Sequence, residues 1–247
     1  CALYVRTVMK ILALDSTAAT ASIALCDDRK LIALVTLNNG LTHTETLLPT
    51  IDMVLKSSGT AVDDIDIFAC AAGPGSFTGV RIGAATIKGL AFGRGKVCIG
   101  ISTLMALAYN LICCDGIICP VMNARRGQVY NAIFDCRAGR LTRLCPDRAI
   151  SLTELYDELA KYDDIIYICG DGYDLIEPSL KIAGLHIAPG HLLWQNAYSV
   201  AVCALELYKG GLRTTDAELV PTYLRMPQAE RERLERLNSK KIKPEKD

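Results

Sequence analysis

A glycine-rich segment from Ala72 to Gly83, with the sequence AGPGSFTGVRIG, has the residue types best suited to bind a small anion. It follows an apolar, strand-like stretch and opens a predicted helix, where free backbone N–H groups attract negative charge. It is not a Walker A loop, because no Gly-Lys-Ser/Thr follows, and its G-x-G-x-x-x-G spacing is one residue longer than the dinucleotide-binding motif. Gly73, Gly75 and Ser76 are therefore candidates for phosphate or nucleotide binding. The alternative is a tight turn in which Ser76 or Thr78 caps the helix.

An acidic residue followed by two hydroxyl residues, Asp15-Ser16-Thr17, ends the first predicted strand. The bare pattern is common, and such residues usually only cap a turn. In actin-like and sugar-kinase-like folds, the corresponding turn faces the nucleotide phosphates and its aspartate lies near the metal. Asp15, Ser16 and Thr17 are therefore added to the phosphate-binding candidates, and we expect their turn to approach the glycine-rich segment.

The histidines and serines predict no metal site and no nucleophile. His43 would need a second histidine four residues on to form a metal site on a helix, and position 47 is leucine. His186 and His191 lie far along the chain, and no G-x-S-x-G motif occurs. We therefore predict no metal ligand and no catalytic residue.

The elements that must position these residues follow from apolar periodicity and turn residues. In the first half we expect three hairpin-connected strands, then helix, strand, helix and strand. The first helix begins with Thr42 and Glu45 in capping-box spacing, and Gly59 ends it. Pro49 suggests either a kink in this helix or a later helix start. The other elements are predicted at residues 11–15, 21–26, 31–37, 65–72, 78–92 and 97–100.

The second half follows the same plan more loosely, with a helix capped by Ser151 and Glu154. Its elements are predicted at residues 117–122, 129–135, 141–144, 152–162, 165–169, 173–183, 185–187 and 196–208. Two β-β-β-α-β-α halves indicate an internal duplication in an α/β protein. We divide the chain into an extension (residues 1–8), two domains (9–107 and 108–227) and a charged tail (228–247), which we expect to be a solvated helix or a docking segment.

Composition narrows the possible functions. The chain has 247 residues, of which 51% are hydrophobic, so it can bury a sizeable core. Its 27 basic and 27 acidic residues balance, so nucleic acid is not expected as the dominant partner. No apolar run is long enough to cross a membrane. The 11 cysteines are scattered without a C-x-x-C pair, which favours reduced core cysteines and a cytoplasmic location.

The helix predicted at residues 78–92 is apolar on two opposite sides, and the sheet of its own domain can cover only one. Gly83 and Gly89 each cost about 1 kcal/mol relative to alanine in a helix, which favours close packing against them. We therefore predict an interface here, the alternative being that the preceding helix covers the second side. The interface candidates are Leu48, Ile51, Val80, Gly83, Ala84, Ile87, Gly89 and Ala91.

Six segments together resemble one family, the bacterial tRNA threonylcarbamoyladenosine biosynthesis proteins TsaB, also called YeaZ. They extend from residue 9 to about residue 225, and the string GPGSFTGVR is long enough to be specific. One position departs from the family, since many members carry aspartate where this chain has Asn123. The segments are MKILALDST (9–17), HTETLLP (43–49), GPGSFTGVRIG (73–83), ISTL (101–104), NARRGQVY (123–130) and VPTYLR (220–225).

The resemblance implies an actin-like fold of two RNase-H-like halves. It also implies a non-catalytic subunit that supports TsaD in forming threonylcarbamoyladenosine beside the tRNA anticodon. The implied partners are TsaD, as a heterodimer, and TsaE, with a homodimer when the chain is alone, only indirect contact with tRNA, and no membrane. No cofactor is expected beyond weak ATP or ADP contact at the partner interface. The competing hypothesis is a stand-alone actin-like enzyme, either a kinase or a metal-dependent, glycoprotease-like peptidase.

Overall fold

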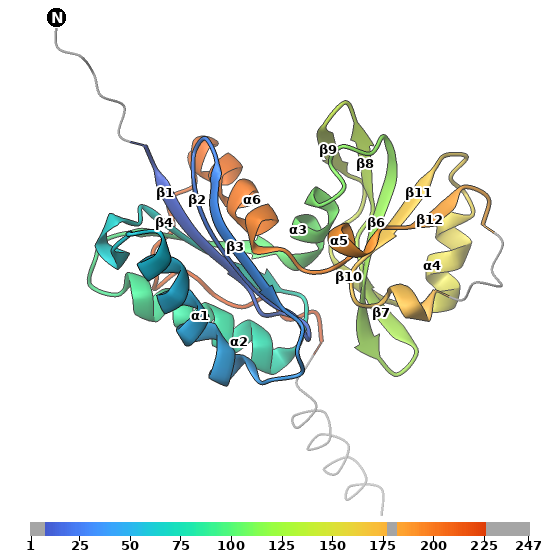
Figure 1. Ribbon diagram of the computed structural model, residues 1–247. Helices are drawn as coiled ribbons and strands as arrows, with labels where there is room; N and C mark the ends of the chain where they lie inside the picture. The colour runs from blue at the N-terminus through green and yellow to red at the C-terminus, as the bar shows by residue number, and fades with distance from the viewer. Residues whose placement is uncertain (1–7, 177–181, 226–247) are drawn as a thin grey trace, which may run out of the picture.

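The computed structural model describes residues 8–176 and 182–225, which form two lobes, each built on one β-sheet (Figure 1). Most of the predicted extension at residues 1–8, part of the helix predicted at 173–183 and the tail at 228–247 lie outside the described residues. Within the described ranges, no helix has the length and apolar character needed to cross a bilayer.

The first sheet has the strand order β3-β2-β1-β4-β5. Three strands form antiparallel hairpins, and two further strands lie parallel to β1 on its other side. Both faces of the central strands are buried, which accounts for their continuous apolar sequences. The strands are β1 (Lys10–Asp15), β2 (Ala21–Asp27), β3 (Leu31–Leu37), β4 (Ile67–Gly73) and β5 (Val97–Ser102).

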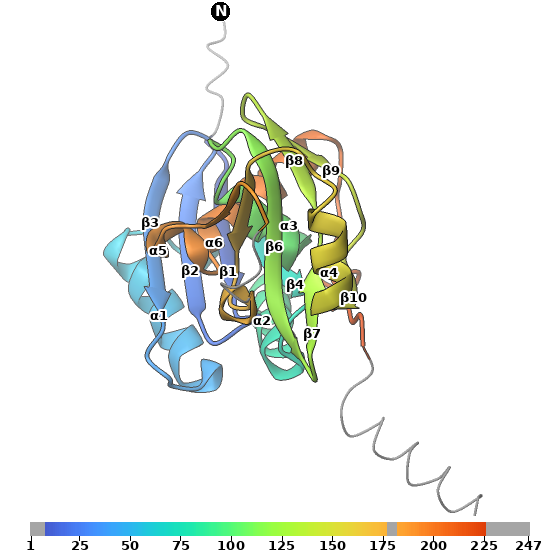
Figure 2. The same ribbon diagram turned by 90° about the vertical axis from the view of Figure 1, so that its right-hand side faces the viewer.

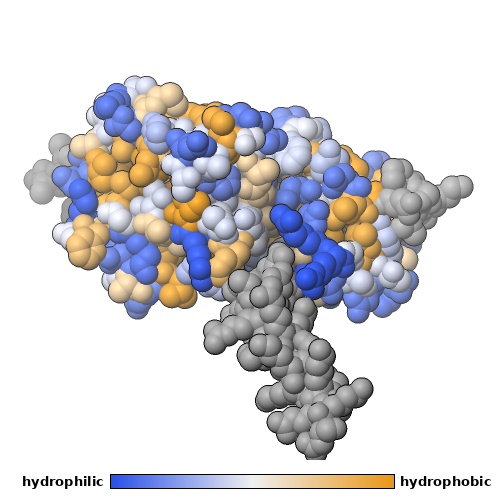
Figure 3. Space-filling view, turned by 90° about the horizontal axis from the view of Figure 1, so that it is seen from below, coloured by the Kyte–Doolittle hydropathy of each residue, from blue (hydrophilic) through white to orange (hydrophobic). Residues whose placement is uncertain are grey.

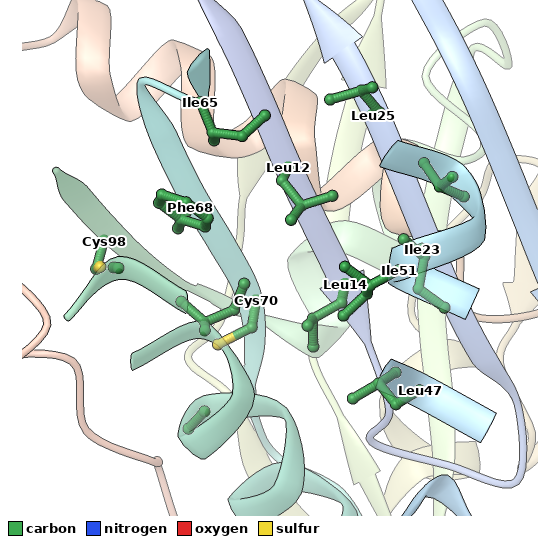
Figure 4. Packing of buried hydrophobic residues seen from close by; sticks show 14 of the residues in the cluster. Leu12, Leu14, Ile23, Leu25, Leu47, Ile51, Ile65, Phe68, Cys70 and Cys98 are labelled. Atoms are coloured by element: carbon green, nitrogen blue, oxygen red, sulfur yellow. The ribbon is translucent and has the colours of Figure 1, made fainter. Parts of the chain in front are cut away.

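Helices α1 (His43–Ser57) and α2 (Phe77–Ala91) cover the outer face of this sheet. Because side chains alternate along a strand, Leu12 and Leu14 of β1 point toward these helices, as Figure 4 shows for Leu14. Thr42 and Glu45 form the predicted capping box at the start of α1, since the Thr42 N–H donates to Glu45 Oε2 at 3.1 Å. The helix continues through Pro49 to Ser57, so the proline does not delay its start.

The second sheet repeats the first in the order β10-β7-β6-β11-β12, with β8 and β9 extending it beside β6. The strand directions also match, because β7 is antiparallel to β6 and β11 and β12 are parallel to it. This confirms the predicted α/β fold of two duplicated halves. The strands are β6 (Gly116–Arg125), β7 (Gln128–Asn131), β8 (Phe134–Arg137), β9 (Arg140–Arg143), β10 (Arg148–Ser151), β11 (Ile166–Cys169) and β12 (Leu185–Ile187).

The first helix of the second lobe is shorter than the predicted range of 152–162. Helix α4 (Leu152–Leu159) lies outside the sheet (Figure 2), with its capping box at Ser151 and Glu154 as predicted. Between β11 and β12, the described residues contain the short 3-10 helix η2 (Tyr173–Leu175). The remaining elements are η1 (Val62–Asp64), α3 (Thr103–Tyr109), α5 (Gly190–Leu193) and α6 (Ala197–Lys209).

The predicted boundary of the second domain, at residues 108–227, needs correction. Helix α6 packs on the inner face of the first sheet, where Val200 and Ala204 contact the cluster built on β1 and β4. The segment after α6 also stays with the first sheet, because the Cys98 N–H donates to the Thr214 carbonyl at 2.9 Å. The reason is that the first sheet is apolar on both faces and needs a second layer, of which its own half supplies only the short helix at residues 103–109.

The cysteines in the described part of the chain are all free thiols, as predicted. Most of them lie in the core, where they pack as small apolar side chains. Burial raises the pKa of Cys70 to about 12, so that its thiol stays protonated at neutral pH.

The two glycines of α2 that the sequence singled out are expected to respond in opposite ways to alanine. A Cβ atom at Gly83 would lie 2.6 Å from Ser16 Oγ and 3.0 Å from Leu14 Cδ1, so Gly83→Ala should lower the free energy of unfolding by about 1–3 kcal/mol. A Cβ atom at Gly89 would meet nothing within 4 Å, so Gly89→Ala should raise it by about 0.5–1 kcal/mol. Urea unfolding of both variants measures this, and effects of the same sign would contradict it.

Candidate functional site

The glycine-rich segment and the Asp15-Ser16-Thr17 turn meet directly, as the sequence led us to expect. The Ser76 N–H donates to the Thr17 carbonyl at 2.6 Å, and Ser16 Oγ donates to the Gly79 carbonyl at 2.9 Å. A Cβ atom at Gly75 would lie 2.5 Å from the Thr17 carbonyl oxygen. Glycine is therefore required because one backbone packs on another here.

A third segment, which the sequence analysis did not connect with the site, completes this junction. The Thr222 N–H donates to the Ala72 carbonyl at 2.7 Å, so residues 220–225 run along the glycine-rich segment. Gly73 has a φ of 115°, and a Cβ atom there would clash with the Thr222 carbonyl. The VPTYLR motif marked this stretch in the sequence, but its place beside residue 73 depends on the path of the chain after α6.

A cleft of about 940 Å³ opens beside the junction, between the two lobes. Its walls include Thr17, Gly75 and Ser76 from the first lobe and Asn123 and Arg125 from the second. The other three phosphate-binding candidates lie in the layer beneath the wall, because Asp15 and Ser16 are fully buried and Gly73 packs on residue 222. Three of the six predicted residues thus face the cleft.

The Asp15 carboxylate is buried beneath the cleft with only one of its oxygens satisfied. Oδ1 accepts from the Thr17 N–H at 2.9 Å and from Thr17 Oγ1 at 2.7 Å, whereas Oδ2 has no partner within the described structure. Burial raises the pKa of Asp15 from 3.8 to about 6, although the Thr17 hydrogen bonds oppose the rise. The burial of the ionised Asp15 carboxylate therefore lowers the free energy of unfolding at neutral pH.

A second raised carboxyl group, Asp171, lies in the cleft wall and was not predicted. Burial raises its pKa to about 6, against the opposing effect of the Gln195 hydrogen bond. Gln195 joins the lobes, because its amide donates to Asp171 Oδ1 at 3.2 Å and its carbonyl accepts from Thr20 Oγ1 at 2.9 Å. The Gly170-Asp171-Gly172 sequence lies directly after β11, and Pro74 and Gly75 lie directly after β4, the matching strand of the first sheet. This equivalent position in the two halves was the signal that could have identified Asp171.

The His43 side chain at the start of α1 forms a hydrogen bond to the backbone of the turn after β1. Its Nε2 donates to the Ala18 carbonyl at 2.7 Å, and Leu47, one turn later, is only 1% exposed in the core. Within the described ranges, no three His, Cys, Asp or Glu side chains are grouped so that they could hold a metal ion.

Comparisons with known proteins give the family. The family model of TsaD, described as tRNA N6-adenosine threonylcarbamoyltransferase, matches residues 40–166. The tRNA threonylcarbamoyladenosine biosynthesis protein TsaB of Bacillus subtilis is 31% identical over 90% of this chain and 96% of its own length. The protein of the same name from Escherichia coli is 30% identical over 88% of this chain and 95% of its own. The chain belongs to the TsaB family.

The structural comparison shows the same fold for YeaZ from Pseudomonas aeruginosa. That structure has a TM-score of 0.72 and 23% sequence identity, and the match covers 87% of this chain and all of the other. By contrast, a tRNA N6-adenosine threonylcarbamoyltransferase from Jannaschia sp. matches over only 80 residues, which is 22% of its length. Similarity to TsaB thus extends over nearly the whole chain.

The structure changes the set of interface candidates on α1 and α2. Leu48 is 56% exposed and Gly89 lies open at the surface. The other candidates are buried against the sheet of their own lobe, so they are unavailable to a partner. The corrected positions are Ile51, Val80, Gly83, Ala84, Ile87 and Ala91.

Proposed function

We propose that this chain acts in tRNA threonylcarbamoyladenosine biosynthesis as a non-catalytic subunit that supports TsaD in the cytoplasm. The proposal rests on the hydrogen bonds that the motif residues form at the junction. The Ser76 N–H, Ser16 Oγ and His43 Nε2 all bond to backbone carbonyls, so the groups that would bind phosphate or metal hold the fold together instead. The names of the TsaB relatives supply the pathway.

The junction fixes the start of α2 against β1, and α1 packs beside it. On the outer side of these helices, Leu48, Met53 and Phe92 are exposed, and Phe92 is 75% exposed. Figure 3 shows hydrophobic residues gathered over this lobe on the underside of the molecule. We call the outer surface formed by Leu48, Met53, Gly89 and Phe92 the helix face. An exposed apolar surface of this kind supports binding to another protein.

The partner assigned to the helix face is TsaD, with which the chain forms a heterodimer that works together with TsaE. In the absence of TsaD, two copies of the chain pair through the same face, since a two-fold contact buries identical patches together. Nucleotide contact is expected to be weak, because the Ser76 N–H is already bonded and no lysine lies in the motif. Calorimetry with ADP and ATP should therefore give no sub-micromolar affinity.

Reconstitution tests the proposed function. The purified chain, TsaD, TsaE, ATP, a threonylcarbamoyl donor and unmodified tRNA are combined, and modified adenosine is measured by mass spectrometry of the digested tRNA. We expect product when the chain and TsaD are both present, and none from the chain without TsaD. Product from the chain alone, catalytic ATP turnover or tight stoichiometric zinc would instead support the stand-alone enzyme, which the name of one YeaZ-like structure, "similarity to peptidase", also suggests.

A further inference from the structure

Three arginines from different parts of the chain lie at or beside the mouth of the cleft. Arg125 and Arg225 line the cleft, and Arg81 contacts Phe77 and Tyr223, which line it. Arg81 lies on α2, Arg125 at the tip of the β6–β7 hairpin, and Arg225 at the end of the segment that crosses the junction. Arg225 donates to the carbonyl oxygens of Ala124 at 2.5 Å and Arg125 at 3.4 Å, which ties that segment to the hairpin. Within the described part of the chain, no carboxylate forms an ion pair with any of these arginines.

Two aromatic rings connect Arg81 to this row. The Phe77 and Tyr223 rings lie 4.6 Å apart between centroids, and the Arg81 guanidinium lies 3.8 Å from the centroid of Phe77. Arg81 Nε also donates to the Tyr223 hydroxyl at 2.9 Å. Tyr223 is 40% exposed, so part of its ring surface is open at the mouth of the cleft. An exposed ring beside guanidinium groups is a surface on which a nucleobase can stack.

The polar groups between the arginines also suit a negative ligand. Ser76, Thr78 and Asn123 are exposed at the mouth, and the first turn of α2 contains no acidic residue. Among the described residues that line the cleft, Asp171 is the one carboxylate, and it is half-buried. A negative group would therefore be attracted to the mouth and repelled from the interior.

We infer that the mouth of the cleft binds an RNA strand, with Arg81, Arg125 and Arg225 holding phosphodiester groups and Tyr223 stacking an unpaired base. The inference rests on the proposed function, because a chain that acts in tRNA modification meets tRNA as its RNA ligand. It replaces the expectation that tRNA is contacted only indirectly. That expectation came from the family resemblance. The net charge of zero, from which nucleic acid was not expected as the dominant partner, averages over the whole chain and does not report local arginine clusters.

An extended strand fits this arrangement better than a free nucleotide does. The three guanidinium groups come from the first lobe, the second lobe and the segment that connects them. The backbone N–H that a nucleotide phosphate would need at Ser76 already donates to the Thr17 carbonyl. Guanidinium groups along a backbone and an aromatic ring for a base are the common elements of single-strand binding.

The test measures binding of a fluorescent anticodon stem-loop RNA to the full chain, alone and in its complex with TsaD. We expect the double variant Arg81→Gln/Arg125→Gln to weaken RNA binding by the chain alone by about tenfold or more near 0.1 M salt. The slope of log affinity against log salt concentration should fall by an amount that corresponds to about one to two lost phosphate contacts. The Arg81→Lys/Arg125→Lys variant should recover most of the affinity. In the reconstituted reaction, the glutamine double variant should raise the KM for tRNA.

A control double variant removes the same two positive charges at positions away from the cleft. Arg29→Gln/Arg140→Gln takes one exposed arginine from each lobe away from the cleft and should leave RNA affinity unchanged. Equal losses in both double variants, or no loss in the first, would overturn the inference. Displacement of the RNA by ADP or inorganic phosphate at low millimolar concentration would also overturn it, in favour of a free-phosphate site. Binding by the chain alone does not depend on TsaD, so a failure of the proposed function would be seen separately, as missing product.

Discussion

Replacement of Gly89 by arginine is expected to abolish association of this chain with TsaD, and also with itself, while the fold is preserved. Gly89 lies on the exposed side of α2, and a Cβ atom there meets nothing within 4 Å, so the monomer has room for the long side chain. In a complex that buries the helix face, the same side chain would place an unpaired guanidinium against apolar residues such as Phe92. We expect affinity to fall at least about 100-fold, since a buried, unpaired charge costs several kcal/mol.

Sedimentation velocity of the variant, alone and mixed with TsaD, gives the result directly. Ala160→Arg is the matched control, because it adds the same side chain at an exposed position after α4 in the other lobe. It should pair normally. Gly83→Arg is not an equivalent test, because position 83 faces Ser16 and Leu14 and the substitution would unfold the lobe. A folded Gly89→Arg protein that still pairs with TsaD would show that the interface is elsewhere.

The two glycines also show what could and could not be predicted from the sequence. The apolar pattern of α2 correctly indicated a helix with two apolar sides, and the cost of glycine in a helix correctly indicated close packing at position 83. The pattern could not tell which side faces the sheet, because both sides have similar apolar content. Burial placed Val80 and Ile87 in the core and left Gly89 outside.

How well each feature could be predicted depends on how far apart in the sequence the contacting residues lie. The order of elements was therefore predictable, and the site was predictable only in part. Strands and capped helices depend on residues close in sequence, so the capping boxes at Thr42 and Ser151 were found from short motifs. The cleft depends on contacts between distant segments. The bonds from Thr222 to Ala72 and from Gln195 to Asp171 follow from the return of α6 to the first sheet, which no local pattern encodes.

Replacement of Asp15 by asparagine is expected to stabilise the isolated chain at pH 8 and to flatten its pH dependence. The pKa of Asp15 is about 6 in the folded chain and 3.8 without burial, so between these values the folded state binds more protons than the unfolded state. The free energy of unfolding therefore falls as the pH rises from about 4 to about 6, and it stays lower above that range. Asp171, whose pKa is raised in the same direction by burial, adds to the same trend.

The expected gain for Asp15→Asn is on the order of 1–3 kcal/mol at pH 8, or a rise in melting temperature of about 3–8 °C, and close to zero at pH 4. Asparagine Oδ1 can keep both hydrogen bonds from Thr17, whereas its amide nitrogen replaces the unpartnered Oδ2 and the charge is removed. Thermal unfolding at several pH values measures the gain, and the exposed Asp157→Asn on α4 should show none. A gain that is equal at pH 4 and pH 8 would contradict the raised pKa as its cause. If the stabilised variant pairs with TsaD but fails to support modification of tRNA, the negative charge of Asp15 has a role in the complex, because its hydrogen bonds are unchanged.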